Sequence, residues 1–313
     1  MGSRRLGLKR MHTLIENLKR EINWNGSTFA RQGGTVFRWN YIDCATPIIS
    51  NLAGHAGADG VMAEGDKFSA IFPGPNAGEL YTAQCIVEGA HTVAAAGFKV
   101  EGTMVATDAE DQATGLNLQG DAKTADDTGM EIILGASEFG GPSAITVGTH
   151  AATIDATFWS SDYTDFDCVS IGFRKVQAHQ AGHGTVIGAG TGDGLYTDYA
   201  VFGVQESDKV QIAKALNGTD TFTDTTETTT DSDNHRFKIS VSAAGVVTYQ
   251  HIKNAVMDGG TLAAPTATQA MTFDDGDVII PYILIHSKGT QDSEILLKSI
   301  TVTRTGGGIA YKS

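Results

Sequence analysis

Short runs in which apolar and polar residues alternate dominate the chain from about residue 80 onward. The clearest is Arg236–Ser242, where Phe, Ile and Val are separated by polar residues. An alternation with a period of two is typical of a strand with one buried face. The turn residues Ala243–Gly245 lead into a second such run, Val246–Ile252, so the two segments predict a β-hairpin.

Two further segments carry distinct strand signals. A second hairpin is predicted over residues 210–222, because Asn217 and Gly218 supply the positive φ angles of a tight turn. Val278–His286 is almost continuously apolar, which is typical of a strand covered on both faces. Pro281 lacks the amide donor of a strand ladder and therefore predicts a bulge or an edge position.

The other predicted strands are separated by Gly, Asp, Asn and Thr residues, as in a sandwich or barrel. At least ten strands without a helix among them predict an all-β fold of two packed antiparallel sheets. These other strands are Thr82–Val87, Phe98–Ala106, Met130–Leu134, Thr153–Trp159, Phe166–Val176, Tyr199–Val204 and Ile295–Arg304.

Residues 1–23 differ from the rest of the chain and predict a basic, amphipathic helical arm. Their apolar residues are spaced alternately three and four positions apart, on one side of a helix of about four turns. An isolated helix of that length is marginal in water, so we expect it to bind another surface or to fold back on its own sandwich. The candidate partner-binding residues are Arg4, Arg5, Leu8, Lys9, Arg10, Met11, Leu14, Ile15, Leu18, Lys19, Arg20 and Ile22.

The change of pattern near Trp24 divides the chain into four predicted segments. The arm spans 1–23, a linker with some extended structure spans 24–79, the β-sandwich spans 80–305, and a C-terminal tail spans 306–313. The linker assignment follows from its many Gly and Ala residues and the lack of a sustained period.

Charge separates the arm from the body. Six basic residues and one acidic residue give the first twenty positions a charge of +5, which leaves −19 for the remainder of a chain whose total is −14. This acidity argues against nucleic acid or an anionic membrane as the partner of the whole surface. No apolar run approaches the roughly 20 residues that span a bilayer, and no signal-type stretch is present, so we expect a soluble protein made in a cytosol.

Several patterns suggest chemistry without meeting its requirements. The Gly-rich stretch 182–194 lacks the Lys-Ser/Thr of a phosphate-binding loop, so a loop between strands is favoured. His179 and His183 have the spacing of helical zinc ligands, but flanking glycines disfavour that helix. The acidic, Thr-rich run 219–234 could bind calcium, although a solvated loop is favoured, and the same holds for the aspartates of 274–277.

Catalytic motifs are likewise incomplete. Glu206 and Asp208 have strand spacing, but Gln211 stands where a sandwich glycanase carries its second acid. The remaining carboxylates lie mainly in turns, where no pair with separated pKa values is expected. Cys44, Cys85 and Cys168 are scattered and predict buried free thiols. We therefore predict no enzymatic activity, no catalytic residues, no structural metal and no cofactor.

One block of residues suggests a family. Phe166–Gln180, with its Asp-Cys, Gly-Phe-Arg-Lys and final Gln, resembles virion structural proteins of marine tailed bacteriophages. The similarity continues through 198–203, 216–218, 235–239 and 245–249, and so extends over roughly 98–304; the Gly-rich loop 181–196 departs from it. The resemblance implies a concanavalin A-like jelly roll that builds or decorates a capsid.

The leading hypothesis is a non-enzymatic capsid decoration or stabilising subunit, held to the shell by its arm. Its expected partners are the major capsid protein or another shell protein and further copies of itself, as in a trimer, with no membrane and no specific nucleic acid. Its expected location is the virion, after synthesis in the host cytoplasm.

Two other functions remain open. The alternative is a carbohydrate-binding jelly-roll module of a phage fibre or particle surface. A glycanase is a third hypothesis, which the broken acidic motif disfavours. The candidate sugar-stacking residues are Trp159, Tyr163, Tyr196, Tyr199 and Tyr249.

Overall fold

The computed structural model describes residues 34–45, 47–50, 61–89, 91–92, 99–101, 115–118, 128–182, 196–205, 208–255, 259–289 and 293–306. These residues form strands and one short 3-10 helix, and none of their helices is long and apolar enough to cross a membrane. The elements are β1 (Thr35–Asn40), β2 (Ile48–Ser50), β3 (Val61–Met62), β4 (Lys67–Pro73), β5 (Leu80–Glu88), β6 (His91–Thr92), β7 (Lys99–Glu101), β8 (Gly115–Asn117), β9 (Gly129–Leu134), β10 (Ile145–Thr146), β11 (His150–Ser160), η3 (Tyr163–Asp165), β12 (Phe166–Lys175), β13 (Tyr199–Gln205), β14 (Lys209–Leu216), β15 (Thr219–Thr228), β16 (Asn234–Val241), β17 (Val247–Lys253), β18 (Val278–Ser287) and β19 (Ile295–Gly306).

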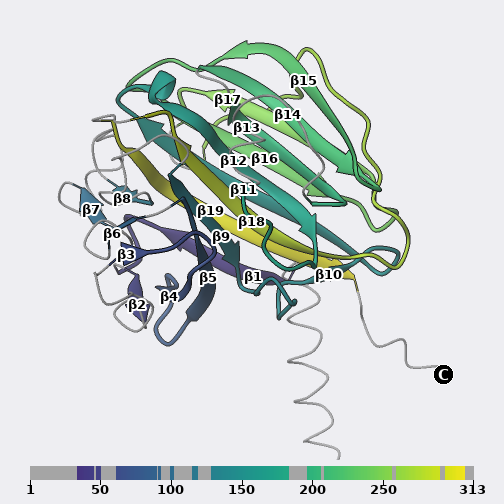
Figure 1. Cartoon of the computed structure of the whole chain (residues 1–313), viewed down its shortest axis with the longest axis horizontal. Coiled ribbons are helices and arrows are strands. Elements are labelled where there is room, and N and C mark those ends of the chain that lie inside the picture. Colours follow the sequence, from purple (N-terminus) through teal and green to yellow (C-terminus); the bar gives the residue numbers. More distant parts are fainter. Residues whose placement is uncertain are drawn as a thin grey trace, which may run out of the picture.

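Two antiparallel sheets make up the body (Figure 1). Sheet A has seven strands in the order β17-β16-β11-β19-β8-β7, with β1 also paired to β19. Sheet B has ten strands in the order β15-β14-β13-β12-β18-β9-β5-β4-β2, with β10 also paired to β18. The prediction of an all-β, two-sheet antiparallel jelly-roll sandwich is thus confirmed.

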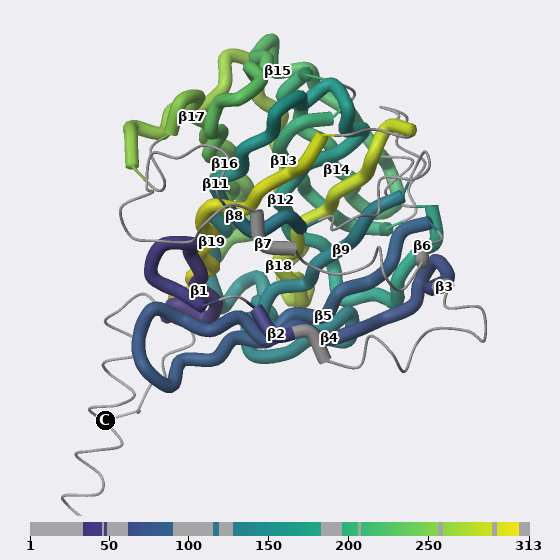
Figure 2. The backbone as a smooth tube through the Cα atoms, turned by 90° about the vertical axis from the view of Figure 1, so that its left-hand side faces the viewer, coloured from purple at the N-terminus to yellow at the C-terminus, as the bar shows by residue number. Residues whose placement is uncertain are grey.

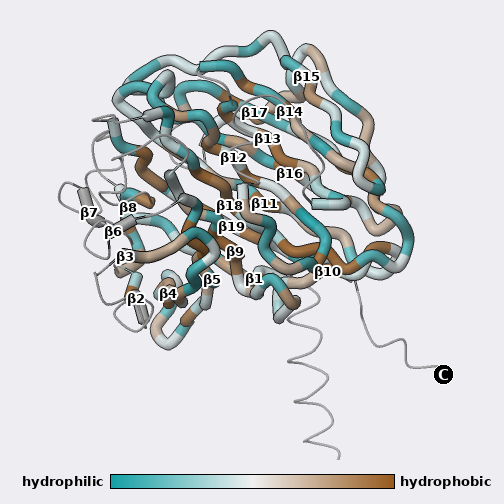
Figure 3. The backbone as a smooth tube through the Cα atoms, in the orientation of Figure 1, coloured by the Kyte–Doolittle hydropathy of each residue, from teal (hydrophilic) through white to brown (hydrophobic). Residues whose placement is uncertain are grey.

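The core lies between the two sheets and follows from the alternation in the sequence. Phe237 and Ile239 of β16 face Phe202 of β13, and the rings of Phe202 and Phe237 lie 5.5 Å apart in an edge-on arrangement. Their polar neighbours on β16 face away from the core. Figure 3 shows the longest apolar stretches in the central strands, such as β12 and β18, whereas β15 is largely polar. Burial of this shared face is the main force that holds the sheets together.

Both predicted hairpins are confirmed. β16 and β17 pair from Val241 opposite Val247, and β14 and β15 pair from Leu216 opposite Thr219. Asn217 and Gly218 have φ values of 51° and 74°, the left-handed geometry that a tight two-residue hairpin requires. The acidic, Thr-rich run is therefore largely an edge strand, β15, and not the solvated loop that its composition favoured.

The prediction that Pro281 marks a bulge or an edge is wrong. β18 is a central strand, and Pro281 is paired with Phe173 of β12. On the other side of β18, the pairing with β10 ends at Ile279 and the pairing with β9 begins at Tyr282. Pro281 therefore lies at the gap between these two partners, where a missing amide donor costs no ladder hydrogen bond.

The assignment of 24–79 to a linker is corrected for its described part. β1 pairs with β19 in sheet A, and β4 pairs with β5 in sheet B. Phe37 and Trp39 are fully buried, and both rings pack edge-on against Phe72. Figure 2 shows these early strands together at the end of the sandwich opposite β15 and β17. The sandwich therefore begins with β1 and not at residue 80.

Three other predictions concern the cysteines, the N-terminal arm and the C-terminal tail. Cys44, Cys85 and Cys168 are buried free thiols, as predicted, and burial raises the pKa of Cys168 to about 12. The predicted arm with all its candidate partner-binding residues lies outside the described residues. So does most of the C-terminal tail.

Candidate functional site

The outer face of sheet A carries a polar groove, which we call the sheet A groove. Its larger hollow has a volume of about 350 Å³, and an adjoining hollow of about 270 Å³ shares Thr153 and Thr303 with it. The described residues that line the larger hollow are Thr35, Arg38, Thr153, Asp155, Arg236, Lys238, Ser299, Thr301 and Thr303.

Strand alternation places these side chains on one face. Asp155 of β11 is paired with Lys238 of β16 on one side and with Thr301 of β19 on the other. Their apolar neighbours, such as Ile154 and Ile239, point into the core. The polar residues are therefore forced outward, and the sheet holds them in a regular array.

An ion pair organises the centre of the groove. Arg236 donates from Nε and Nη2 to the two carboxylate oxygens of Asp155, at 2.7 and 2.8 Å. A two-point contact of this kind fixes the plane of the guanidinium group. Arg38 is exposed at one end and Lys238 is half-buried near the other, and among the described residues neither of them forms an ion pair. Three cations against one carboxylate give the groove a local charge of +2.

The residues predicted to stack on sugars do not line this groove. Trp159, Tyr163, Tyr196, Tyr199 and Tyr249 are all buried, with at most 9% of any side chain exposed. They pack within the sandwich or against its covered faces, because an aromatic ring at an alternating strand position is as well suited to a core as to a platform. The prediction of these five as stacking residues is corrected.

A second polar site, the sheet B cluster, is buried on the outer face of sheet B. It comprises Glu88 of β5, Glu131 of β9, Arg174 of β12, and the covering residues His179 and Tyr196. Glu131 alternates with Met130 and Ile132 of the core, so its side chain leaves the sheet on the opposite face.

Glu131 is fully paired within this cluster. Arg174 Nε donates to Glu131 Oε1 at 2.7 Å, and the Tyr196 hydroxyl donates to Oε2 at 2.8 Å. The Arg174 guanidinium also lies 4.3 Å from the centre of the Tyr196 ring, in a cation–π contact. Burial lowers the pKa of Arg174, but the Glu131 charge outweighs it and the net pKa is raised.

Glu88 is buried without a hydrogen bond to either carboxylate oxygen. His179 Nδ1 lies 3.6 Å from Oε1 and His286 Nε2 lies 3.8 Å from Oε2. Burial raises the pKa of Glu88 well above its ordinary value, because desolvation penalises the carboxylate more than nearby cations stabilise it. Burial lowers the pKa of His179, but Glu131 and Glu88 outweigh this effect and its net pKa is raised.

The sequence placed the carboxylates mainly in turns, but Glu88 and Glu131 are both strand residues. Glu88 and Glu131 lie on adjacent strands, in diagonal positions of the β5–β9 ladder. Both side chains are fully buried, so the described geometry gives a substrate no access to them. Of the acidic motif considered from the sequence, Glu206 lies outside the described residues and Gln211 is buried on β14.

A sequence signal for the sheet B cluster exists but is local and weak. Glu131 interrupts the apolar run 130–134, and Arg174 ends the apolar part of 166–176. A charge inside a strand covered on both faces requires a partner. The sequence does not say which one.

Comparisons with known proteins find similarity only at the level of structure. No protein-family model and no curated protein sequence matches the chain. A Lotus tetragonolobus seed lectin is 9% identical, with a TM-score of 0.44, and the match covers 67% of this chain and 93% of that one. Lectin I from Ulex europaeus, in complex with the methyl glycoside of alpha-L-fucose, is 10% identical, with a TM-score of 0.43, and the match covers 67% and 91%.

A third similar structure is described as that of an enzyme. A beta-1,3-glucanase from Mycobacterium marinum is 9% identical, with a TM-score of 0.36, and the match covers 86% of this chain and 98% of that one. At these scores the similarities carry no functional conclusion for this chain.

Proposed function

We propose that the protein is a non-catalytic carbohydrate-binding sandwich whose sheet A groove takes an anionic polysaccharide. One observation carries the proposal: a hydroxyl-lined groove with a local charge of +2 lies on a protein whose net charge is −14. Hydroxyl groups both donate and accept hydrogen bonds, as sugar hydroxyls do. The local cations attract the acidic groups that an anionic glycan adds.

The spread of the cations favours a polymer over a single sugar. Arg38 lies on β1 and Lys238 on β16, with β19 and β11 between them. Three strand spacings correspond to about 14 Å. Two cations so far apart engage one extended chain with repeated charges, and the threonine rows between them supply contacts along its length.

Replacing both flanking cations is expected to weaken binding of an anionic glycan. In the variant Arg38→Ala/Lys238→Ala, the dissociation constant for alginate should rise by at least about a hundredfold, because two charge-assisted contacts of about 1.5–3 kcal/mol each are lost. Isothermal titration calorimetry and co-sedimentation at low and high salt measure the change, and the wild-type affinity should fall as salt is added.

The exposed Lys253, on β17 and outside the groove, provides the matched control. Lys253→Ala should bind alginate as the wild type does. Equal binding of dextran and alginate, or equal affinity of all three proteins, would contradict an anionic-glycan groove.

We further propose that this module works on a virion. The resemblance of 166–180 to virion structural proteins supports that setting, as does the contrast between a segment of charge +5 and a remainder of −19. A basic segment can attach to an acidic shell surface, and several copies on one particle bind far more tightly than one.

Deletion of residues 1–23 tests this setting. Every described strand lies C-terminal to that segment, so the truncated protein should unfold cooperatively with an unchanged Tm. It should also keep its affinity for alginate while failing to co-purify with assembled particles. Normal incorporation into particles would contradict attachment through the arm.

A further inference from the structure

Only some of the carboxylates in and around the sheet B cluster are paired with a lysine or an arginine. Glu131 pairs with Arg174, and Glu138 pairs with Lys67. Glu64 and Glu88 have no lysine or arginine within ion-pair distance among the described residues. Two carboxylates close together, one of them fully buried, are unfavourable in their ionised form unless a proton or a metal cation lies between them.

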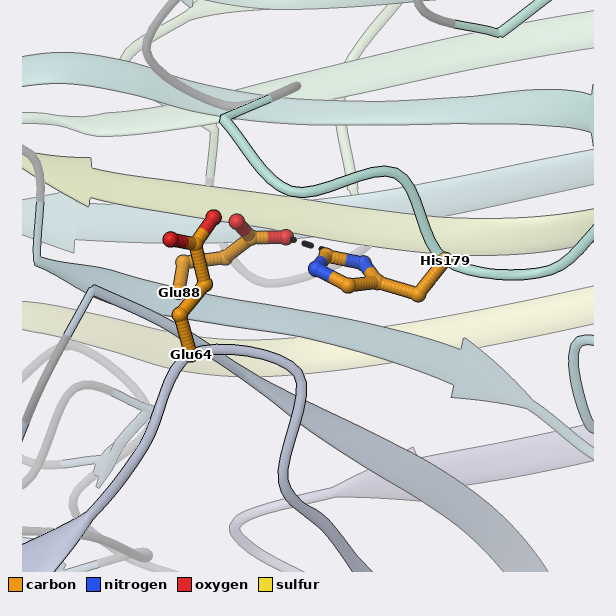
Figure 4. Close-up of side chains that lie close together, drawn as sticks. All are labelled: Glu64, Glu88 and His179. Carbon is orange, nitrogen blue, oxygen red and sulfur yellow. Dashed lines mark ion pairs between the residues drawn. The ribbon is translucent and has the colours of Figure 1, made fainter.

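Three segments that are distant in sequence bring a possible ligand set together (Figure 4). Glu64 comes from the turn between β3 and β4, Glu88 ends β5, and His179 follows β12. One ligand atom from each of the three lies within 4.8 Å of the others, and Glu88 Oε1 is 3.6 Å from His179 Nδ1. Carboxylate oxygens and an imidazole nitrogen at such separations surround a cation after small side-chain adjustments.

The state of Glu88 supplies a second, independent observation. Its side chain is fully buried and points toward Glu64 and His179, and neither of its oxygens accepts a hydrogen bond. His179 Nε2 is also buried without a hydrogen-bond partner. Buried polar atoms normally have a hydrogen-bond partner, and those that lack one are destabilising unless a ligand or an ion pairs with them.

We propose that Glu64, Glu88 and His179 bind a divalent transition-metal ion. An imidazole ligand with two carboxylates suits Zn²⁺ or Mn²⁺ better than Ca²⁺ or Mg²⁺, which prefer oxygen ligands alone. Gly182 donates its amide hydrogen to Glu64 Oε1 at 2.5 Å, which orients this carboxylate from outside the ligand set. Glu64 is exposed, so a water molecule can complete the coordination.

The ion's role would be to hold the segment after β12 against sheet B. It would link that segment to the β3–β4 turn and to the end of β5. These three segments are distant in sequence, so the ion would act as a cross-link between them. The site is on the opposite sheet from the sheet A groove, so its existence is independent of glycan binding. The sequence alone does not reveal this site, because Glu64, Glu88 and His179 lie far apart along the chain.

Zinc titration of the full-length, untagged, chelator-treated protein tests the proposal. Calorimetry should give one Zn²⁺ per chain, and a hundredfold excess over Kd should raise Tm by about 5 °C, because the folded state alone presents the three ligands. Co²⁺ should give a visible absorption band that Zn²⁺ displaces. Ca²⁺ should produce neither the Tm increase nor competition.

Glu88→Gln and His179→Gln should each lower Zn²⁺ affinity at least a hundredfold, and Glu64→Gln at least tenfold. Glu79→Gln, in the β4–β5 connection away from the cluster, is the matched control and should bind as the wild type does. Glu88→Gln keeps the shape of the side chain and removes a buried ionisable group, so the metal-free variant should remain folded by circular dichroism. Absence of Zn²⁺ binding up to millimolar concentration would overturn the proposal, as would equal binding by folded Glu88→Gln and His179→Gln.

Discussion

Replacing Arg174 by leucine is expected to lower the free energy of unfolding by about 3–5 kcal/mol, the cost of leaving a buried charge without its partner. Arg174 and Glu131 are both fully buried, and the 2.7 Å contact between them is the principal ion pair of the sheet B cluster. Leucine cannot supply the hydrogen bond that Glu131 Oε1 accepts, and the ring of Tyr196 loses its cation. Urea denaturation measures the effect.

A double-mutant cycle separates the ion pair from simple packing. Arg174→Leu/Glu131→Leu removes both charges, so it should be more stable than Arg174→Leu alone, because a buried pair is often replaceable by apolar residues of similar volume. Lys253→Leu, at an exposed position of β17, should change stability by less than about 0.5 kcal/mol. A loss below about 1 kcal/mol in Arg174→Leu would show that the charge is solvated in the folded protein.

Acid is expected to destabilise the protein through His235 and His251, whose stacked rings lie where β16 and β17 of sheet A approach β15 of sheet B. His235 Nε2 lies 3.1 Å from the amide nitrogen and 3.4 Å from the carbonyl oxygen of Thr230. His235 Nδ1 in turn lies 3.0 Å from His251 Nε2, and His251 Nδ1 lies 2.7 Å from Glu227 Oε2. This chain of contacts connects β16 and β17 of sheet A to β15 of sheet B.

Burial and the neighbouring His251 lower the pKa of His235 from 6.5 to about 3. In the unfolded chain, His235 therefore binds a proton below about pH 6.5, whereas in the folded protein it does so only near pH 3. The stability that neutral His235 provides is complete above pH 6.5 and is lost as the pH falls toward 3. From this group alone, the free energy of unfolding should drop by roughly 2–3 kcal/mol between about pH 7 and pH 4.5.

The variant His235→Gln isolates this contribution. Its free energy of unfolding should fall less steeply with acid than that of the wild type, whatever its stability at neutral pH. His150→Gln, which removes a histidine that accepts a single hydrogen bond from Thr146, should keep the wild-type slope. Parallel curves for wild type and His235→Gln in urea titrations would contradict the assignment.

Some features of the fold follow directly from local sequence. Alternation along 236–242 predicts a half-buried strand, and Asn217-Gly218 predicts a tight hairpin, because each depends on the conformations of neighbouring residues only. The scattered cysteines predict free thiols for a similar reason. These predictions hold because they need no knowledge of which strands are neighbours.

The strand order could not be predicted in this way. The segment 34–79 has no sustained period, yet β1 and β4 are held by the partners that the fold gives them, β19 and β5. Pro281 illustrates the same limit, because a residue that is unfavourable in most central strands is accommodated where β9 and β10 leave a gap. Tertiary context overrides local propensity at such positions.

By itself, then, the sequence determined the class of fold, the two hairpins and the acidity of the body. The tertiary structure alone decided which charges meet. Glu88 and Glu131 are neighbours because β5 pairs with β9, and His179 reaches Glu88 because the segment after β12 crosses sheet B. Alternation states that a side chain leaves one face of a strand, but its neighbours across the sheet depend on long-range pairing. The polar sites are made of such neighbours, so they appear only once the chain is folded.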